Sequence, residues 1–292
     1  MKRLLLTVNP VAGKGRGKTK LFEATDIFTK NGYRVTVLPT SPKGTEKVIQ
    51  EEAENFDLVV AIGGDGTLNS VASGIIKSES NVPMGYIPLG STNDFGFSLG
   101  LTKNVANECQ RICESDPRFI DVGRLDDRYF VYIACAGLFA GASYMTSQQL
   151  KNAIGHSAYV LKGFLELAEF QRTNYRVEFD GEVTEDDYLY VGISNTLRAG
   201  GIFNLPKDEV SFDDGFFELT LIKNPSKITD RVALTNDFFN SNLNSKYFFH
   251  KKIEKAIIYS DTPKGWSLDG ENGGERSKVS FEVVKRKLNF IY

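Results

Sequence analysis

The chain has 292 residues, of which 41% are hydrophobic and 25% charged, as expected of a folded protein with a sizeable core. Its 35 Lys and Arg residues nearly balance its 37 Asp and Glu residues, giving a formal net charge of −2. This balance argues against a nucleic-acid-binding protein, which needs a basic excess. Only two histidines are present, which excludes a zinc site made of three histidines, whereas glycine is abundant with 27 residues. The composition therefore predicts chemistry performed by carboxylates and backbone amides.

Neither cysteine chemistry nor membrane insertion is predicted. The odd cysteine count (Cys109, Cys113 and Cys135) fits a reducing compartment. Cys109 and Cys113 are expected to lie on one helix and to pack as small apolar side chains. No signal peptide is visible, because the apolar start of the chain turns into Asn9 and Pro10 too early. The uncharged stretch 129–150 is strongly apolar only as far as residue 142, which favours buried core over a membrane span.

The first part of the chain alternates short apolar runs with helical patterns. Strands are predicted at residues 4–8, 33–38, 57–62 and 84–87, and helices at 18–30, 45–54, 66–77 and 104–114. Such βαβ repetition predicts an α/β N-terminal domain with an open, mostly parallel sheet, which we place at residues 1–122.

After about residue 122 strands dominate. They are predicted at 130–136, 175–179, 188–194, 216–222, 255–259 and 279–284, with helices only at 158–170 and 227–239. Runs of strands predict a β-rich, sandwich-like C-terminal domain at residues 123–292, whose last strand could return to the first domain.

A glycine-rich loop follows the first predicted strand. Residues 9–19 nearly match the phosphate-binding P-loop pattern, but Ala12 replaces its first glycine and no strand ending in Asp follows in the usual place. A true P-loop is therefore not predicted. The milder interpretation remains, in which amides at a helix N-terminus attract phosphate, with Lys14, Arg16 and Lys18 nearby.

Two further loops each follow a strand and precede a helix. Residues 62–69 read Ile-Gly-Gly-Asp-Gly-Thr-Leu-Asn and bring Asp65, while residues 87–94 read Ile-Pro-Leu-Gly-Ser-Thr-Asn-Asp and bring Asp94. Either loop alone could be a tight turn in which Asp caps a helix. Because loops at the carboxyl ends of strands share one crevice in an open α/β sheet, the pair predicts a nucleotide–metal site.

These motifs resemble the catalytic domain of the soluble bacterial diacylglycerol kinases and related lipid kinases. The similarity rests on Asn9-Pro10, on residues 63–69 and on residues 88–94, and it extends over essentially the whole chain. It implies a fold shared with the ATP-binding part of NAD kinases. It also implies ATP contacts from Asn9, Pro10, Gly13, Thr40, Gly64, Asp65, Gly66, Thr67, Leu68, Asn69 and Thr92. Ser70 departs from the family pattern, where many relatives have Glu.

The resemblance further implies a metal segment at residues 210–216. By that match the main-chain oxygens of Ser211 and Phe216 and the carboxylate of Asp214 would hold a structural Mg²⁺, linked through water to Asp65 and Asp94. A second Mg²⁺ would accompany ATP. Without the resemblance, Asp213-Asp214-Gly215 reads as a hairpin turn.

The segment Leu268-Asp-Gly-Glu271 resembles the catalytic segment of the family, which makes Glu271 the predicted general base, acting with Asp65 and Asp94. Phosphoryl transfer to an alcohol needs a group that accepts the hydroxyl proton, and a positioned carboxylate can do so. Asp269-Gly270 also reads as a turn on its own.

The leading hypothesis is an ATP- and Mg²⁺-dependent kinase for a membrane lipid, with diacylglycerol as the first candidate. It implies a cytoplasmic protein in peripheral contact with the inner face of the membrane, without nucleic-acid partners. A homodimer is compatible with this hypothesis. The alternatives are a soluble-substrate kinase of the NAD kinase type and a catalytically idle nucleotide- or lipid-binding relative. The aromatic residues 238, 239 and 247–249 speak weakly against an NAD kinase, since they could equally be core.

Overall fold

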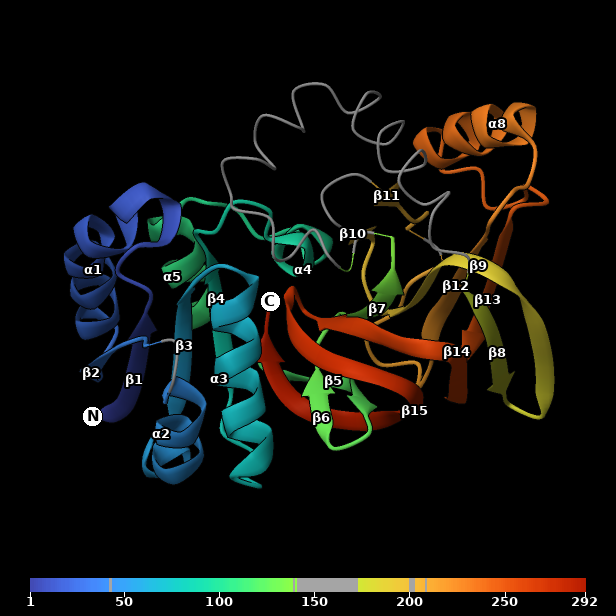
Figure 1. Cartoon of the computed structure of the whole chain (residues 1–292). Helices are drawn as coiled ribbons and strands as arrows, with labels where there is room; N and C mark the ends of the chain where they lie inside the picture. Colours follow the sequence, from blue (N-terminus) through green and yellow to red (C-terminus); the bar gives the residue numbers. More distant parts are fainter. Residues whose placement is uncertain (42–43, 139, 141–172, 200–202, 208) are drawn as a thin grey trace. The chain divides into compact units, whose positions relative to one another are not determined.

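The computed structural model describes residues 1–41, 44–138, 140, 173–199, 203–207 and 209–292. The chain divides into two compact units (Figure 1). The first contains residues 1–122, 212–214 and 284–292, and the second contains residues 123–211 and 215–283. Each unit is described by itself below.

A parallel sheet forms the centre of the first unit. Its strands are β1 (Lys2–Val8), β2 (Tyr33–Pro39), β3 (Leu58–Gly63), β4 (Met84–Pro88) and the end of β15 (Glu271–Ile291), in the order β15-β4-β3-β1-β2. Strand β3 is buried along its whole length, as expected of a central strand covered on both faces. Phe290 and Ile291 of β15 pair in parallel with Met84 and Gly85 of β4, so the last residues of the chain join this sheet.

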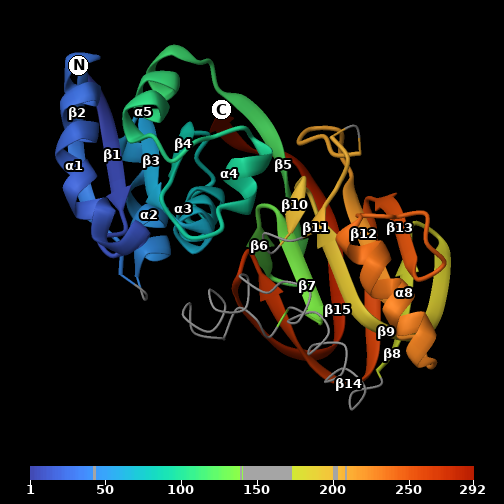
Figure 2. The same cartoon turned by 90° about the horizontal axis from the view of Figure 1, so that it is seen from above.

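Helices pack in pairs in this unit, α1 (Ala12–Lys30) with α5 (Val105–Glu114) and α2 (Thr45–Glu52) with α3 (Asp65–Lys77) (Figure 2). A short helix, α4 (Asp94–Ser98), follows β4, and a single 3₁₀ turn, Ala53–Asn55, follows α2. The pairing of α2 with α3 requires a glycine at residue 74, since a Cβ there would lie 2.6 Å from Ile49 Cβ.

The second unit is built of antiparallel strands. They are β6 (Arg128–Phe130), β7 (Ile133–Gly137), β8 (Asn174–Phe179), β9 (Glu182–Ser194), β12 (Phe217–Lys223), β13 (Phe248–Ile253), β14 (Lys255–Leu268) and most of β15, together with the end of β5 (Arg118–Leu125). The path β13-β12-β9-β7-β14-β15 is extended by β8, which pairs with β9 and β14. A two-stranded sheet, β10 (Arg198–Ala199) with β11 (Phe203–Asn204), and helix α8 (Ile228–Phe239) complete it.

Two apolar clusters form the core of this unit. One lies between strands and contains Trp266, Phe217, Phe281 and Phe130. The other includes Leu234 and Phe238 of α8. The predicted fold class is confirmed: an α/β N-terminal part and a β-rich, sandwich-like C-terminal part.

Several predicted boundaries were wrong, and each error has a physical reason. Helix α1 begins at Ala12 and not at residue 18, because the glycines that suggested a loop are accommodated in its first turns. Strands β5 and β13 were not predicted, because both mix charged and apolar residues without strict alternation. The helix predicted at 158–170 lies outside the described residues. Of the stretch 129–150, the described part contributes to β6 and β7.

Candidate functional site

Asn9 anchors the first loop at the carboxyl end of β1. Its N–H donates to Ile62 O at 2.9 Å, and its side-chain amide lies 3.5 Å from Thr67 Oγ1. Helix α1 approaches closely from the other side, since a Cβ at Gly17 would lie 2.2 Å from Asn9 O. The loops that follow β1 and β3 therefore meet at Asn9.

The neighbouring predicted residues lie on the same edge of the sheet. Pro10 follows Asn9 and is half-buried, and Gly13 adopts a left-handed φ of +59° in the first turn of α1. Thr40 follows β2, and its N–H donates to Val8 O at 2.8 Å. The structure thus places Asn9 and Thr40 at the carboxyl ends of adjacent parallel strands, where ligands bind in open α/β sheets.

The loops after β3 and β4 are packed backbone against backbone. A Cβ at Gly90 would lie 2.5 Å from Gly64 Cα, so residue 90 must be glycine for the two loops to touch. A hydrogen bond joins them as well, because Asn93 N–H donates to Asp65 Oδ2 at 2.9 Å. The two glycine-bearing loops therefore form one continuous surface.

Asn93 organises this surface and was not predicted as a site residue. It is buried and adopts a left-handed φ of +55°, a conformation that Asn tolerates better than most residues. Its side-chain amide accepts from Gly90 N at 2.8 Å and donates to Gly90 O at 2.9 Å. The Tyr86 hydroxyl lies 3.4 Å from Asn93 Oδ1 and 3.3 Å from Gly63 O. The sequence offered one signal, an Asn two residues after a Gly-Ser pair in a strand-to-helix turn.

Two carboxylates concentrate negative charge in this loop pair. Asp65 begins α3, and Asp94, which is 2% exposed, begins α4. Burial, followed by the charges of Asp65 and Asp94, holds the pKa of the Tyr86 hydroxyl well above its usual range. Both carboxylates thus disfavour the ionised form of the same hydroxyl.

The remaining predicted ATP contacts lie in the same two loops. Gly66, Thr67, Leu68 and Asn69 form the first turn of α3, where the N–H groups of Thr67 and Leu68 both donate to Gly64 O. Thr92 is half-buried and directly precedes Asn93. All predicted ATP contacts therefore lie in the first unit, at the carboxyl ends of β1, β2, β3 and β4.

The predicted metal segment passes from one unit to the other. Ser211 and Phe216 belong to the second unit and Asp214 to the first, so the ligand set stays a prediction. Gly215 has a φ of +82°, consistent with a turn at this point. Asp121 of β5, a carboxylate that sequence reasoning missed, is 1% exposed; its N–H donates to Phe212 O and its Oδ1 accepts from Arg286 N, both at 2.7 Å.

Glu271 is the first residue of β15 and is exposed. It pairs with Leu268 across a two-residue hairpin, in which Asp269 and Gly270 have φ angles of +48° and +86°. Positive φ at both central residues defines a type I′ turn, which favours Asp-Gly. The predicted turn is confirmed, and it presents the carboxylate of Glu271 directly after the hairpin.

Asp269 also fixes this hairpin to strand β7. Its fully buried carboxylate accepts hydrogen bonds from the N–H groups of Val131, Tyr132 and Ile133 at 2.6, 2.9 and 3.0 Å, and its own N–H donates to Ile133 O at 2.8 Å. This role was not predicted, because the partners lie far away in the sequence.

The cysteines and the aromatic residues for which the sequence predicted no role in the site also lie outside these loops. Cys109 packs in the core of the first unit, and burial raises its pKa to about 12, as it does for Cys135 in the second unit. All three cysteines are free. Phe238, Tyr247 and Phe248 are core residues, so these aromatics do not discriminate between lipid and soluble acceptors.

Among the residues that the structure describes, no group of three or more His, Cys, Asp or Glu side chains is arranged to hold a metal ion. In the described part of the chain, no helix is long and apolar enough to cross a membrane.

Comparisons with known proteins cover both units. A family model described as the diacylglycerol kinase catalytic domain matches residues 3–125. A second, described as the YegS C-terminal NAD kinase beta sandwich-like domain, matches residues 133–290. The diacylglycerol kinase of Staphylococcus aureus strain MRSA252 is 31% identical over 278 residues, which are 94% of this chain and 87% of that protein.

Solved structures from Bacillus anthracis strain Sterne share the fold. One has a TM-score of 0.84 at 26% identity and covers 100% of this chain and 95% of its own. Another, of a diacylglycerol kinase, has a TM-score of 0.77 and covers 100% of this chain and 97% of its own. At 23% identity the second shows the fold alone.

Proposed function

The chain belongs to the diacylglycerol kinase family of lipid kinases, and on this premise we propose that it transfers the γ-phosphoryl group of ATP to a hydroxyl of a membrane lipid. The first candidate acceptor is diacylglycerol, with phosphatidic acid as the product. We propose a cytoplasmic protein that reaches its acceptor at the inner face of the membrane.

The contact between the loops after β3 and β4 is the observation that carries this proposal. Gly64 and Gly90 let the two loops pack backbone against backbone, while Asn93 holds Asp65 in place through its N–H. Backbone amides at the start of α3 and the adjacent loops suit phosphate groups, because a helix N-terminus bears partial positive charge. Asp65 and Asp94 are unfavourable beside phosphate unless a cation or a hydroxyl accompanies them.

The oxygens of these carboxylates are chemically suited to a magnesium ion. Asp65 and Asp94 would supply hard oxygen ligands at the nucleotide loops, and Asp214, with the main-chain oxygens of Ser211 and Phe216, would be the set for a structural ion. When bound, Mg²⁺ neutralises charge on the phosphate oxygens. ATP would contact Asn9, Thr40 and the first turn of α3.

Glu271 is the proposed general base. The hydroxyl oxygen of the acceptor forms a bond to the γ-phosphorus, the bond from that phosphorus to the bridging oxygen of ADP breaks, and the hydroxyl proton passes to the Glu271 carboxylate. Exposure of Glu271 at the end of a hairpin suits a group that meets a substrate. The hairpin is fixed to β7 by Asp269, which would hold the base in a defined direction.

The experiment is phosphorylation with radiolabelled ATP and Mg²⁺, in which a total lipid extract, purified diacylglycerol in mixed micelles and NAD⁺ are parallel acceptors. We expect label in a lipid product and none in NADP⁺. Label in NADP⁺ alone would replace the proposal with a soluble-substrate kinase. Absence of label from every acceptor, despite measured ATP binding, would favour a catalytically idle relative.

A further inference from the structure

Strand β15 contains a β-bulge directly after the proposed base. Leu268 pairs with Glu271 and Ser267 with Asn272, but Trp266 pairs with Gly274, so Gly273 is an extra residue in the ladder. A Cβ at Gly273 would lie 2.7 Å from the backbone oxygen of Trp266, so the bulge requires glycine there. Bulges bend a strand and change the direction of nearby side chains, and they are common beside active sites. The shape of this bulge therefore sets the direction of the chain at Glu271.

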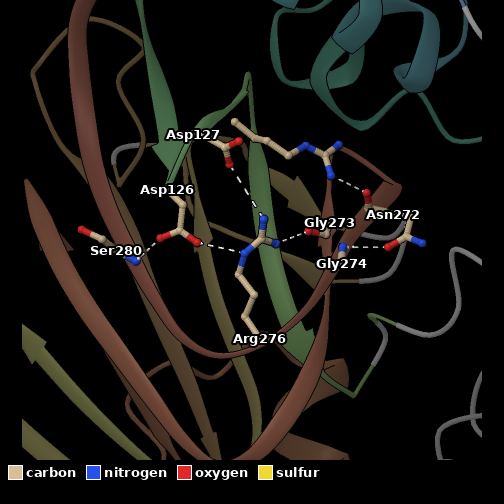
Figure 3. Close-up of polar contacts among 8 residues, drawn as sticks. Asp126, Asp127, Asn272, Gly273, Gly274, Arg276 and Ser280 are labelled. Atoms are coloured by element: carbon tan, nitrogen blue, oxygen red, sulfur yellow. Dashed lines mark hydrogen bonds and ion pairs between the residues drawn. The ribbon is translucent and has the colours of Figure 1, made fainter.

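Two arginines donate to the backbone of the bulge (Figure 3). Arg276 Nη1 donates to Gly273 O, and Arg128 Nη1 donates to Asn272 O, both at 2.5 Å. Within the bulge, Gly274 N–H donates to Asn272 Oδ1 at 2.7 Å. The carbonyl of the extra residue, which lies outside the regular ladder, thus has a charged donor.

Arg276 is itself held by the turn between β5 and β6. Its Nε lies 3.1 Å from Asp126 Oδ2, and its Nη2 lies 3.8 Å from Asp127 Oδ1 (Figure 3). The Asp126 side chain is 30% exposed, whereas that of Asp127 is 84% exposed, so the Asp126 contact is less screened by solvent. Asp126 is fixed in turn, because its Oδ1 accepts from Ser280 N and its N–H donates to Ser280 O, both at 2.8 Å.

We infer that Arg276, oriented by Asp126, is a positioning residue that directs the Glu271 carboxylate through the bulge at Gly273. The inference rests on the proposed role of Glu271. A guanidinium can bind Asp126 with one edge and Gly273 O with another nitrogen, because its donors form a rigid fork. A lysine ammonium has no such fork, so it cannot hold both partners in the same geometry.

An ion pair between strands β5 and β15 provides a matched control. Arg124 of β5 forms an ion pair with Glu282 of β15 at 2.5 Å, between side chains that are 42% and 50% exposed. It joins β5 to β15, whereas Arg276 joins β15 to the turn that follows β5, and it lies away from the bulge. If Arg276 only stabilised the sheet, substitution of either arginine would have similar consequences.

The test compares Arg276→Gln, Arg276→Lys, Arg124→Gln and the wild type in the full chain, with radiolabelled ATP and the lipid acceptor. For Arg276→Gln we expect kcat to fall about 10- to 100-fold while KM for ATP stays within about twofold, since small misplacement of a reacting group has effects of this order. Arg276→Lys should restore little of the loss, and Arg124→Gln should retain wild-type kcat. Wild-type kcat in Arg276→Gln, or full rescue by lysine, would overturn the inference.

Hydrogen exchange separates this inference from the proposed function. In Arg276→Gln, peptides covering residues 271–275 should exchange faster than in the wild type, with unchanged exchange in the β8–β9 hairpin. Unchanged exchange at residues 271–275 would overturn the positioning role of Arg276, whatever the activity of the variant. A wild-type chain that phosphorylates no lipid, or a Glu271→Gln variant with wild-type kcat, would instead refute the proposed function.

Discussion

The buried carboxylate of Asp269 should contribute more to stability than any exposed turn residue of the second unit. It accepts three backbone hydrogen bonds, and it is fully buried. An unsatisfied buried donor costs about 1–3 kcal/mol. Asp269→Ala leaves three backbone N–H donors without their acceptor, so it should lower the free energy of unfolding by about 3–5 kcal/mol if the site relaxes partly. Asp269→Asn keeps one oxygen for Tyr132 and Ile133 and loses mainly the bond from Val131, so about 1–3 kcal/mol is expected.

The hairpin between β8 and β9 offers a matched comparison. Asp180 and Gly181 form the same kind of two-residue turn, with φ angles of +44° and +89°. The Asp180 carboxylate also accepts two backbone hydrogen bonds, from Glu254 and Lys255 at 3.0 and 3.1 Å, but it is exposed. In Asp180→Ala water can replace the lost acceptor, so we expect about 1 kcal/mol, mostly from alanine at positive φ.

Trp266 provides the assay. It is the only tryptophan of the chain, is 2% exposed and lies in the core of the second unit, so its fluorescence during urea titration reports the unfolding of that unit. Asp269→Ala should shift the urea midpoint more than Asp269→Asn, and Asp269→Asn more than Asp180→Ala. Equal shifts for Asp269→Ala and Asp180→Ala would refute the argument that burial determines the cost.

Two further predictions concern loop packing and pH. Gly90→Ala would place a Cβ 2.5 Å from Gly64 Cα, so calorimetry should show ATP affinity reduced at least about tenfold, whereas Gly265→Ala, with no atom within 4 Å of its Cβ, should bind as the wild type; equal affinities would contradict the proposed nucleotide loops. Burial lowers the pKa of His250 in the folded chain, and its Nδ1 is bonded to Thr220 Oγ1 at 2.9 Å. The unfolded chain therefore binds more protons below about pH 6.5, so stability should be fully present above that pH and fall as the pH drops towards the folded pKa. His250→Gln should flatten this part of the stability profile measured by Trp266 fluorescence, and an unchanged profile would exclude His250 as its source.

Local signals were sufficient for much of the fold. Strand β3 and helix α3 are strongly patterned, and the structure has them within a residue or two of the prediction. The Asp269-Gly270 turn was predicted from two residues, because type I′ geometry itself selects that pair. Helix α1 was shortened in the prediction, because its glycines read as a loop; Gly13 and Gly15 do take positive φ, but they lie within the first turns of the helix.

The candidate site was predictable only where its residues carry motifs. The loops with Asp65 and Asp94 were found because strand order places their ends on one edge of the sheet. Asn93 was missed as the link between them, because its importance comes from contacts with Gly90 and Asp65 that no spacing rule specifies. The same limit applies to Asp269, whose partners at 131–133 lie more than a hundred residues earlier in the chain.

The most direct test of the central claim is phosphoryl transfer by Glu271→Gln under single-turnover conditions, with ATP binding measured on the same preparation. Glutamine retains the size of the side chain but cannot accept the hydroxyl proton. The account predicts a rate of transfer to the lipid hydroxyl about 10²- to 10⁴-fold below the wild type, with ATP affinity within about twofold, because a general base contributes on this order and does not contact the nucleotide loops. A variant that transfers phosphate at the wild-type rate would contradict it.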